Sequence, residues 1–104
     1  MGLDVECMQE AMRRAYYARD SQRGLYATFA WFVEEVGELA EALLGKRGDE
    51  GVEEEIADVM AWLLSIANLV GVDVGKAFAR KYGGDLDAVG CLAGLEGVHH
   101  FGQG

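Results

Sequence analysis

No proline occurs anywhere in this 104-residue chain, so the residue that most strongly ends or kinks a helix is absent. A proline inside a helix costs about 3 kcal/mol. A proline-free sequence rich in alanine, leucine, valine and glutamate therefore favours long, uninterrupted helices. Glycine is the turn-forming residue that remains, and it marks the expected helix ends. The expected fold is all-α.

Hydrophobic residues at helical spacing predict four helices. The break between the first two is placed at residues 20–24, where Gly24 follows a polar stretch. The break between the second and third is placed at residues 45–51, which contain three glycines. Because this second break is short, the two central helices are expected to pack antiparallel. The predicted helices cover residues 3–19, 26–44, 52–70 and 74–82.

The length of the chain suits a single domain. Residues 1–84 are expected to form it, and the glycine-rich residues 85–104, which include His99 and His100, are expected to form a weakly structured tail. A chain of this size buries only about 60–70% of its unfolded surface, yet 51% of its residues are hydrophobic. We therefore expect a homo-oligomer, a dimer or a tetramer, whose subunits together complete a helical bundle.

The charge balance excludes some partners. With 18 acidic and 9 basic residues the net charge is −9, which argues against binding a nucleic acid duplex. The longest apolar run, Val59–Leu64, is far too short to span a membrane, and Asp4 and Glu6 interrupt any signal peptide. Cys7 and Cys91 match no zinc or redox spacing. A cytoplasmic protein with reduced thiols is expected.

The second predicted helix has an acidic face. It carries Glu34, Glu35, Glu38 and Glu41 without any lysine or arginine, and Trp31 lies among them. An ordinary amphipathic helix turned toward water is one interpretation. However, carboxylates four residues apart repel each other, and a solvated face would normally include lysine. The pattern therefore favours a cation-binding face.

The third predicted helix is apolar nearly all round from residue 56 to residue 70, and Asp58 is the only charge in that stretch. Such a helix is expected to be buried on most sides, and Asp58 with it. A buried carboxylate without a cation is costly, and no lysine or arginine lies three or four residues away. Either another part of the fold or a metal ion is expected to face Asp58.

Two pairs of acids are expected to meet. Glu35 and Glu38 lie one turn apart on the second helix, and Glu55 and Asp58 lie one turn apart on the third. Antiparallel packing would bring the pairs face to face. Carboxylates without histidine or cysteine select Mg²⁺ or Mn²⁺ over zinc.

The segment Glu34-Glu35-Val36-Gly37-Glu38-Leu39, followed by Glu55-Ile56-Ala57-Asp58, resembles the MazG-type nucleotide pyrophosphohydrolases. These belong to an all-α group that also holds dimeric dUTPases and phosphoribosyl-ATP pyrophosphohydrolases. The resemblance implies a four-helix subunit. It also implies magnesium-dependent hydrolysis of a nucleoside triphosphate, between the α and β phosphates, to monophosphate and pyrophosphate.

The resemblance also implies roles for individual acids. Glu35, Glu38, Glu55 and Asp58 match the family's magnesium ligands. Glu34 matches the first glutamate of the motif, which either activates water or orients a ligand, and Glu38 is the other catalytic candidate.

Substrate contacts are expected from side chains outside the acidic motif. Trp31 and Trp62 are candidates to stack on the nucleobase, although each would also suit the core. The candidates to reach phosphate or sugar are Asn68, Lys76, Arg80 and Lys81, the last two of which would equally suit a helix C-terminus.

Alternatives remain open at this point. Some relatives carry a cysteine-rich tail, whereas this chain has the lone Cys91 there, which puts a tail contribution to the site in doubt. The same acids would also serve a phosphoribosyl-ATP pyrophosphohydrolase or a dUTPase-like enzyme. A non-catalytic helical dimerisation module is the alternative outside the enzymes.

Overall fold

The computed structural model describes residues 3–46 and 48–92, and every regular element within them is a helix. The all-α prediction is therefore confirmed. The chain divides into two compact units, residues 1–72 and 73–104. The expected boundary at residue 84 stays a prediction, and His99 and His100 lie outside the described residues. The elements are α1 (Val5–Arg23), α2 (Leu25–Glu41), the π-helix η1 (Ala42–Lys46), α3 (Gly48–Val70) and α4 (Val74–Ala88).

Helix α1 is longer than its sequence predicted. It begins after Asp4, whose side chain accepts a hydrogen bond from the backbone N–H of Cys7 at 2.7 Å. It passes through the expected break because Asp20 is buried and pairs with Arg23 one turn later, at 2.8 Å. Gly24 ends the helix with a φ of 96°, a conformation that glycine adopts without strain. The predicted end at residue 19 was wrong, since the polar stretch is stabilised within the helix.

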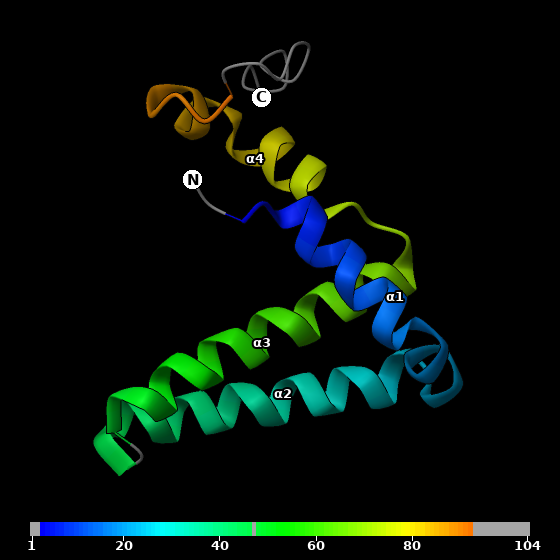
Figure 1. The fold of residues 1–104 in the computed structure, drawn as a ribbon, viewed down its shortest axis with the longest axis vertical. Coiled ribbons are helices and arrows are strands. Elements are labelled where there is room, and N and C mark those ends of the chain that lie inside the picture. Colours follow the sequence, from blue (N-terminus) through cyan, green and yellow to red (C-terminus); the bar gives the residue numbers. More distant parts are fainter. Residues whose placement is uncertain (1–2, 47, 93–104) are drawn as a thin grey trace. The chain divides into compact units, whose positions relative to one another are not determined.

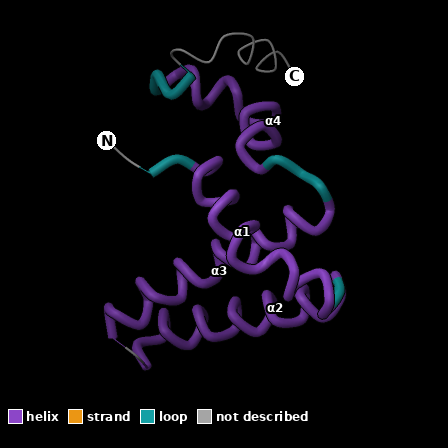
Figure 2. The backbone as a smooth tube through the Cα atoms, turned by 45° about the vertical axis from the view of Figure 1, so that its right-hand side comes forward, coloured by secondary structure: helices purple, strands orange, loops and turns teal. Residues whose placement is uncertain are grey.

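Helices α2 and α3 form an antiparallel hairpin (Figures 1 and 2). The chain reverses through η1, where Gly45 has a φ of 85°. Helix α3 then begins at Gly48, one turn before the predicted start at residue 52. The acids of its opening turns are favourably placed at the positive end of the helix dipole. The predicted antiparallel arrangement of the central helices is present.

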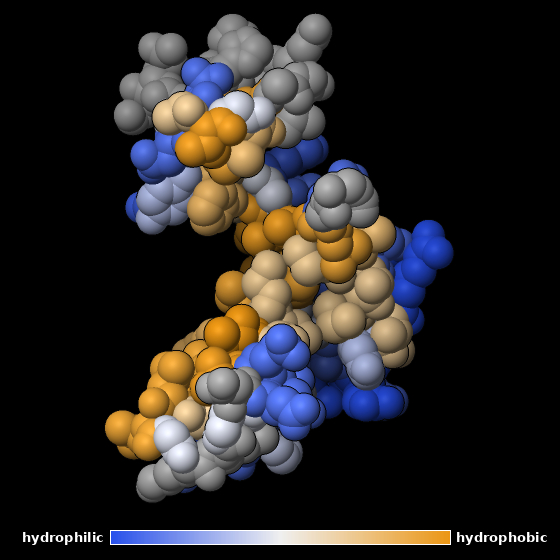
Figure 3. All heavy atoms as spheres, turned by 60° about the vertical axis from the view of Figure 1, so that its left-hand side comes forward, coloured by the Kyte–Doolittle hydropathy of each residue, from blue (hydrophilic) through white to orange (hydrophobic). Residues whose placement is uncertain are grey.

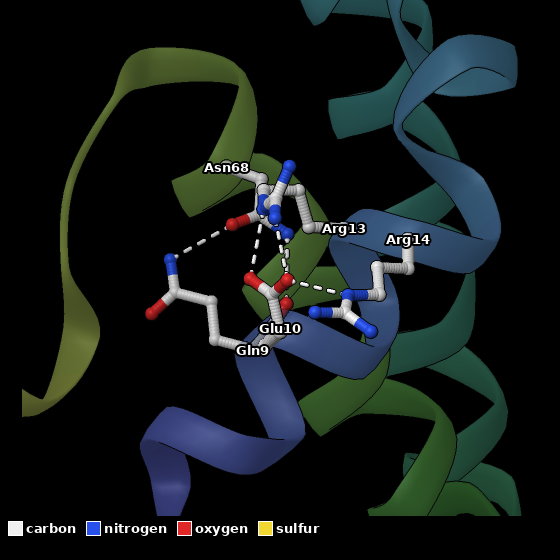
Figure 4. Close-up of polar contacts among 5 residues, drawn as sticks. All are labelled: Gln9, Glu10, Arg13, Arg14 and Asn68. Atoms are coloured by element: carbon white, nitrogen blue, oxygen red, sulfur yellow. Dashed lines mark hydrogen bonds and ion pairs between the residues drawn. The ribbon is translucent and has the colours of Figure 1, made fainter.

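Helix α1 packs against α3, and a polar link joins them (Figure 4). The side-chain amide of Gln9 donates to Asn68 Oδ1 at 3.0 Å and to the backbone carbonyl of Val72 at 2.7 Å. Asn68 Nδ2 donates in return to the backbone carbonyl of Gln9 at 3.2 Å. This exchange fixes the register of α1 on the C-terminal half of α3.

Few side chains of the first unit are fully enclosed. Leu64 and Thr28 are the largest among the described residues. Along α2, by contrast, Phe29 and Val33 are each 50% exposed and Val36 is 42% exposed. Figure 3 shows hydrophobic side chains gathered along one side of the α2–α3 hairpin. The hairpin thus leaves apolar surface in contact with water.

The second unit contains α4, which Asp73 caps by accepting a hydrogen bond from the backbone N–H of Lys76 at 2.9 Å. The helix is kinked at Tyr82 and continues to Ala88, past its predicted end at residue 82. Among the described residues no single helix is long and apolar enough to cross a membrane; only α3 and α4 taken together reach that length and composition.

Candidate metal centre

The α2–α3 hairpin brings three acids together. Glu35 comes from α2, and Glu55 and Asp58 come from successive turns of α3. One carboxylate oxygen of each lies within 4.8 Å of the other two. We call these three residues the acidic cluster. The structure thus brings together three of the four acids that were predicted to meet across the hairpin.

Burial within the acidic cluster differs from what the sequence suggested. Glu55 is the buried member, at 3% exposure, whereas Asp58 is exposed. The expectation that Asp58 is enclosed by apolar side chains was wrong. Three residues turn a helix by about 300°, so Asp58 points away from Glu55 by about 60°, toward a pocket between α1 and α3. Nor is α3 enclosed on all sides, since Ile56 is 55% exposed.

The electrostatics of the acidic cluster disfavour three charged carboxylates. The pKa of Glu35 is raised from 4.5 to about 7, and burial is the largest cause. A hydrogen bond between the carboxyls of Glu35 and Glu55 and the negative charges of Glu38, Glu55 and Asp58 contribute the rest of this rise in pKa. Without a cation, the arrangement therefore favours the protonated form of Glu35.

The donor set of the acidic cluster suits a hard divalent cation. It offers only carboxylate oxygens, the ligands that Mg²⁺ and Mn²⁺ prefer over softer donors. Ligands on opposite sides of one Mg²⁺ lie about 4.2 Å apart, so oxygens within 4.8 Å of one another need only small side-chain movements to share an ion. The Oε1 atom of Glu55 is buried and accepts no hydrogen bond within the described residues. The residues present therefore fit a metal ion.

The other two glutamates of the motif flank the acidic cluster. Glu38 is half-buried one turn from Glu35, and its charge contributes to the raised pKa of Glu35. Its carboxylate is not one of the three grouped within 4.8 Å. Glu34 is exposed. The metal-binding role predicted for Glu38 and the catalytic roles predicted for both residues stay predictions.

Comparison with known protein families matches residues 23–83 to the MazG nucleotide pyrophosphohydrolase domain. The chain belongs to the MazG family. The match covers all of α2 and α3 and every acid of the motif, which places the chain among the nucleotide pyrophosphohydrolases, a class of hydrolases. A search of curated proteins finds no match.

The two tryptophans of this MazG domain contact each other. The rings of Trp31 and Trp62 stack with centroids 6.2 Å apart and an interplanar angle of 14°. The guanidinium of Arg23 lies over the Trp62 ring, 5.2 Å from its centroid. Trp31 is nonetheless 48% exposed. The stack explains why an aromatic residue lies on the acidic face of α2, and contact with a nucleobase stays a prediction for both tryptophans.

The remaining predicted substrate contacts belong to α3 and α4. Asn68 uses its amide in the link between α1 and α3. Lys76, Arg80 and Lys81 are on α4, in the second unit, where Lys81 lies over the ring of Tyr82 at 5.6 Å. Binding of substrate by these four residues stays a prediction.

A pocket beside the acidic cluster contains residues that the sequence interpretation did not select. Its volume is about 250 Å³, and it lies between α1 and α3. Arg19 and Arg23 line it from α1, and Asp58 and Trp62 line it from α3. Had α1 been extended to Arg23, the spacing of Tyr16, Arg19 and Arg23 at i, i+3 and i+7 would have placed them on one face. Because the first helix was predicted to end at residue 19, Arg23 was not placed on this face.

Proposed function

We propose that this chain hydrolyses nucleoside triphosphates, with ribose or deoxyribose, to the monophosphate and pyrophosphate in a reaction that requires Mg²⁺, with Mn²⁺ as a substitute. One observation carries the proposal. Glu35, Glu55 and Asp58 present carboxylate oxygens within 4.8 Å of one another, in a chain of the MazG family. Among the described residues, no other group of three acids is placed to share one ion.

In the proposed reaction the acidic cluster holds the metal, and Glu38 accepts a proton from the attacking water. The oxygen of that water bonds to the α-phosphorus. The bond from this phosphorus to the oxygen bridging the α and β phosphates breaks, and pyrophosphate leaves with the electron pair. Magnesium supplies positive charge that offsets the phosphate oxygens and makes water more acidic. Glu34, exposed one turn before Glu38 on α2, is the second candidate for the proton acceptor.

The test is direct. Purified protein is incubated separately with each common NTP and dNTP in the presence of Mg²⁺, and monophosphate and pyrophosphate are quantified. We expect equal amounts of both products from at least one nucleotide, no reaction in EDTA, and a strong loss of turnover in Glu38→Gln. A folded, magnesium-loaded protein that hydrolyses none of these nucleotides would contradict the proposal.

Two further substrates separate the enzymatic alternatives. Turnover of phosphoribosyl-ATP alone would indicate the phosphoribosyl-ATP pyrophosphohydrolase activity, and turnover of dUTP alone would indicate a dUTPase-like enzyme. If none of these substrates reacts with a folded, magnesium-loaded protein, the result would favour a helical dimerisation module. The products distinguish the bond that is cleaved, because cleavage between the β and γ phosphates releases orthophosphate instead.

We also propose that a second copy of this chain covers the apolar side of α2. Phe29, Val33 and Val36 follow one another at i, i+4 and i+7, the spacing of a helix-packing face, and each is at least 42% exposed. A two-helix hairpin completes a four-helix bundle by pairing with another hairpin. Sedimentation equilibrium should show a dimer or tetramer at micromolar concentration, and Val33→Glu should shift it toward the monomer. A wild-type monomer would contradict this assembly.

A further inference from the structure

The pocket between α1 and α3 lies next to the acidic cluster, because Asp58 belongs to both. Two guanidinium groups line it, from Arg19 and Arg23. We infer that Arg19 and Arg23 bind the β and γ phosphates of the nucleotide, and the pyrophosphate that they become, in this pocket. The inference rests on the proposed function, and Arg19 lies outside the residues matched to the family.

Arg23 is held in position before any ligand arrives. Its Nη1 donates to Asp20 Oδ1 at 2.8 Å and to Thr28 Oγ1 at 3.3 Å, and both of these partners are buried. Its guanidinium also lies over the Trp62 ring, 5.2 Å from the centroid. A side chain fixed in this way loses little conformational entropy on binding. Arg23 is therefore preorganised to bind an anion.

The contacts of Arg23 leave donors available. Both hydrogen bonds of its side chain leave from Nη1, so within residues 3–46 and 48–92 Nε and Nη2 donate none. The Trp62 contact uses the flat face of the guanidinium, whereas its N–H groups point outward in the plane. Two neighbouring N–H donors in one plane match two oxygens of a phosphate group. Arg23 thus retains N–H donors along one edge of its guanidinium, and these can bind two phosphate oxygens.

Arg19 contributes the uncompensated charge. It lies over the ring of Tyr16 at 5.4 Å, and no carboxylate pairs with it among the described residues. The other arginines of α1 differ, since Arg13 and Arg14 both pair with Glu10 outside the pocket. An arginine without an acidic partner is unexpected in a chain of net charge −9, and an anionic ligand would supply the missing partner.

The size and lining of the pocket favour a diphosphate over a nucleobase. Its volume of about 250 Å³ is below the roughly 300–1,000 Å³ of pockets that enclose a whole drug-sized ligand. The Trp62 indole already contacts Arg23 and Trp31, so it is not simply open to a base. The polyphosphate would lie with one end toward the acidic cluster and the other between the arginines.

The charge of Asp58 makes phosphate binding in this pocket depend on a bound cation. Its carboxylate would repel a phosphate in the pocket unless a cation on the acidic cluster offsets the charge. Pyrophosphate is therefore expected to bind well with Mg²⁺ and poorly in EDTA. This expectation concerns binding of the reaction product and needs no turnover.

Isothermal titration calorimetry with inorganic pyrophosphate, with and without Mg²⁺, tests the inference. Arg19→Ala should weaken pyrophosphate binding by about tenfold to a hundredfold, the scale for hydrogen bonds to charged groups. Arg23→Lys keeps the charge beside Asp20 but loses the planar pair of donors, and it should weaken binding by about tenfold. Arg14→Ala is the matched control, because it removes the same charge from α1 outside the pocket, and it should bind as the wild type does.

The outcomes separate this inference from the proposed function. Wild-type protein that binds no pyrophosphate in the presence of Mg²⁺, or Arg19→Ala and Arg23→Lys that both bind it like the control, would overturn the inference whether or not nucleotides are hydrolysed. If the two variants bind nucleosides more weakly than the wild type but bind pyrophosphate equally well, the inference is also overturned, because the pocket then binds the base. Pyrophosphate binding that depends on Arg19, in a protein without turnover, would instead refute the hydrolase and leave the anion site standing.

Discussion

Two polar groups of residues lie along α3, and they differ in how their hydrogen-bonding capacity is met. Near the C-terminal end, Gln9 and Asn68 exchange hydrogen bonds and also reach the Val72 carbonyl, so donors face acceptors. Near the N-terminal end, the acidic cluster brings acceptors together, and burial and mutual repulsion raise the pKa of Glu35 to about 7. The first group is complete within the chain. The second group gathers negative charge, which a cation would offset.

This difference separates a structural link from a functional site. A matched amide pair stabilises the packing of α1 on α3 and needs no ligand. Crowded carboxylates work against stability, and groups with strongly shifted pKa values gather at functional sites. A substitution in the acidic cluster should therefore lower activity without lowering stability, whereas a substitution in the amide link should lower stability without lowering activity.

The largest effect is expected at Glu55, the buried acid. Glu55→Gln keeps the shape of the side chain but removes a ligand charge, so turnover should fall by about a hundredfold or more. In EDTA the same variant should be as stable as the wild type or more so, because like-charge repulsion is relieved. Steady-state kinetics and urea unfolding measure the two quantities.

Glu53→Gln is the matched control for Glu55→Gln, since Glu53 is an exposed acid two residues earlier on α3. It should change neither turnover nor stability measurably. If Glu55→Gln instead unfolds the metal-free protein, Glu55 is a structural partner and the contrast between the two groups on α3 is lost.

A smaller effect, on stability rather than turnover, is expected at the amide link. Asn68→Ala removes the exchange with Gln9 across α1 and α3, which should lower the free energy of unfolding by about 1–2 kcal/mol. Turnover at saturating substrate and KM should change little. A higher KM with unchanged stability would show instead that Asn68 binds substrate, as its sequence position suggested.

The last expected effect concerns the metal-free protein alone and is a pH dependence of its stability. The pKa of Glu35 is raised from 4.5 to about 7 in the folded chain. Between those two values the unfolded chain has released this proton while the folded chain retains it, so the free energy of unfolding falls as pH rises through that window. In EDTA the melting temperature should therefore drop between about pH 5 and about pH 8. The drop should be smaller in Glu35→Gln, and equal drops would refute this origin.

The helices and the acidic cluster were open to prediction because they depend on local features. Periodicity placed α2 and α3. Two pairs of acids at a spacing of three residues on adjacent helices predicted a meeting of four acids, of which the structure groups Glu35, Glu55 and Asp58 but not Glu38. The end of α1 was missed for a physical reason. Asp20 is polar and looks like part of a turn, but its burial and its pairing with Arg23 keep the chain helical.

Burial and the pocket depend on packing and were therefore harder to predict. A helical wheel shows that Glu55 and Asp58 lie about 60° apart, but it does not show which of them faces α2. Arg19 was predicted as the last residue of the first helix and Arg23 as part of the following break, and only the docking of α1 on α3 brings both beside Asp58. Tertiary contact, rather than spacing along the chain, decides these features.

Asp58 is shared by the acidic cluster and the pocket, and this has a thermodynamic consequence for the proposed sites. Two ligands that meet at one side chain must change each other's affinity by the same factor. Magnesium would tighten pyrophosphate, and pyrophosphate would tighten magnesium to an equal extent. Product and ion would then dissociate most readily together, so the step that empties the enzyme would slow as free magnesium rises.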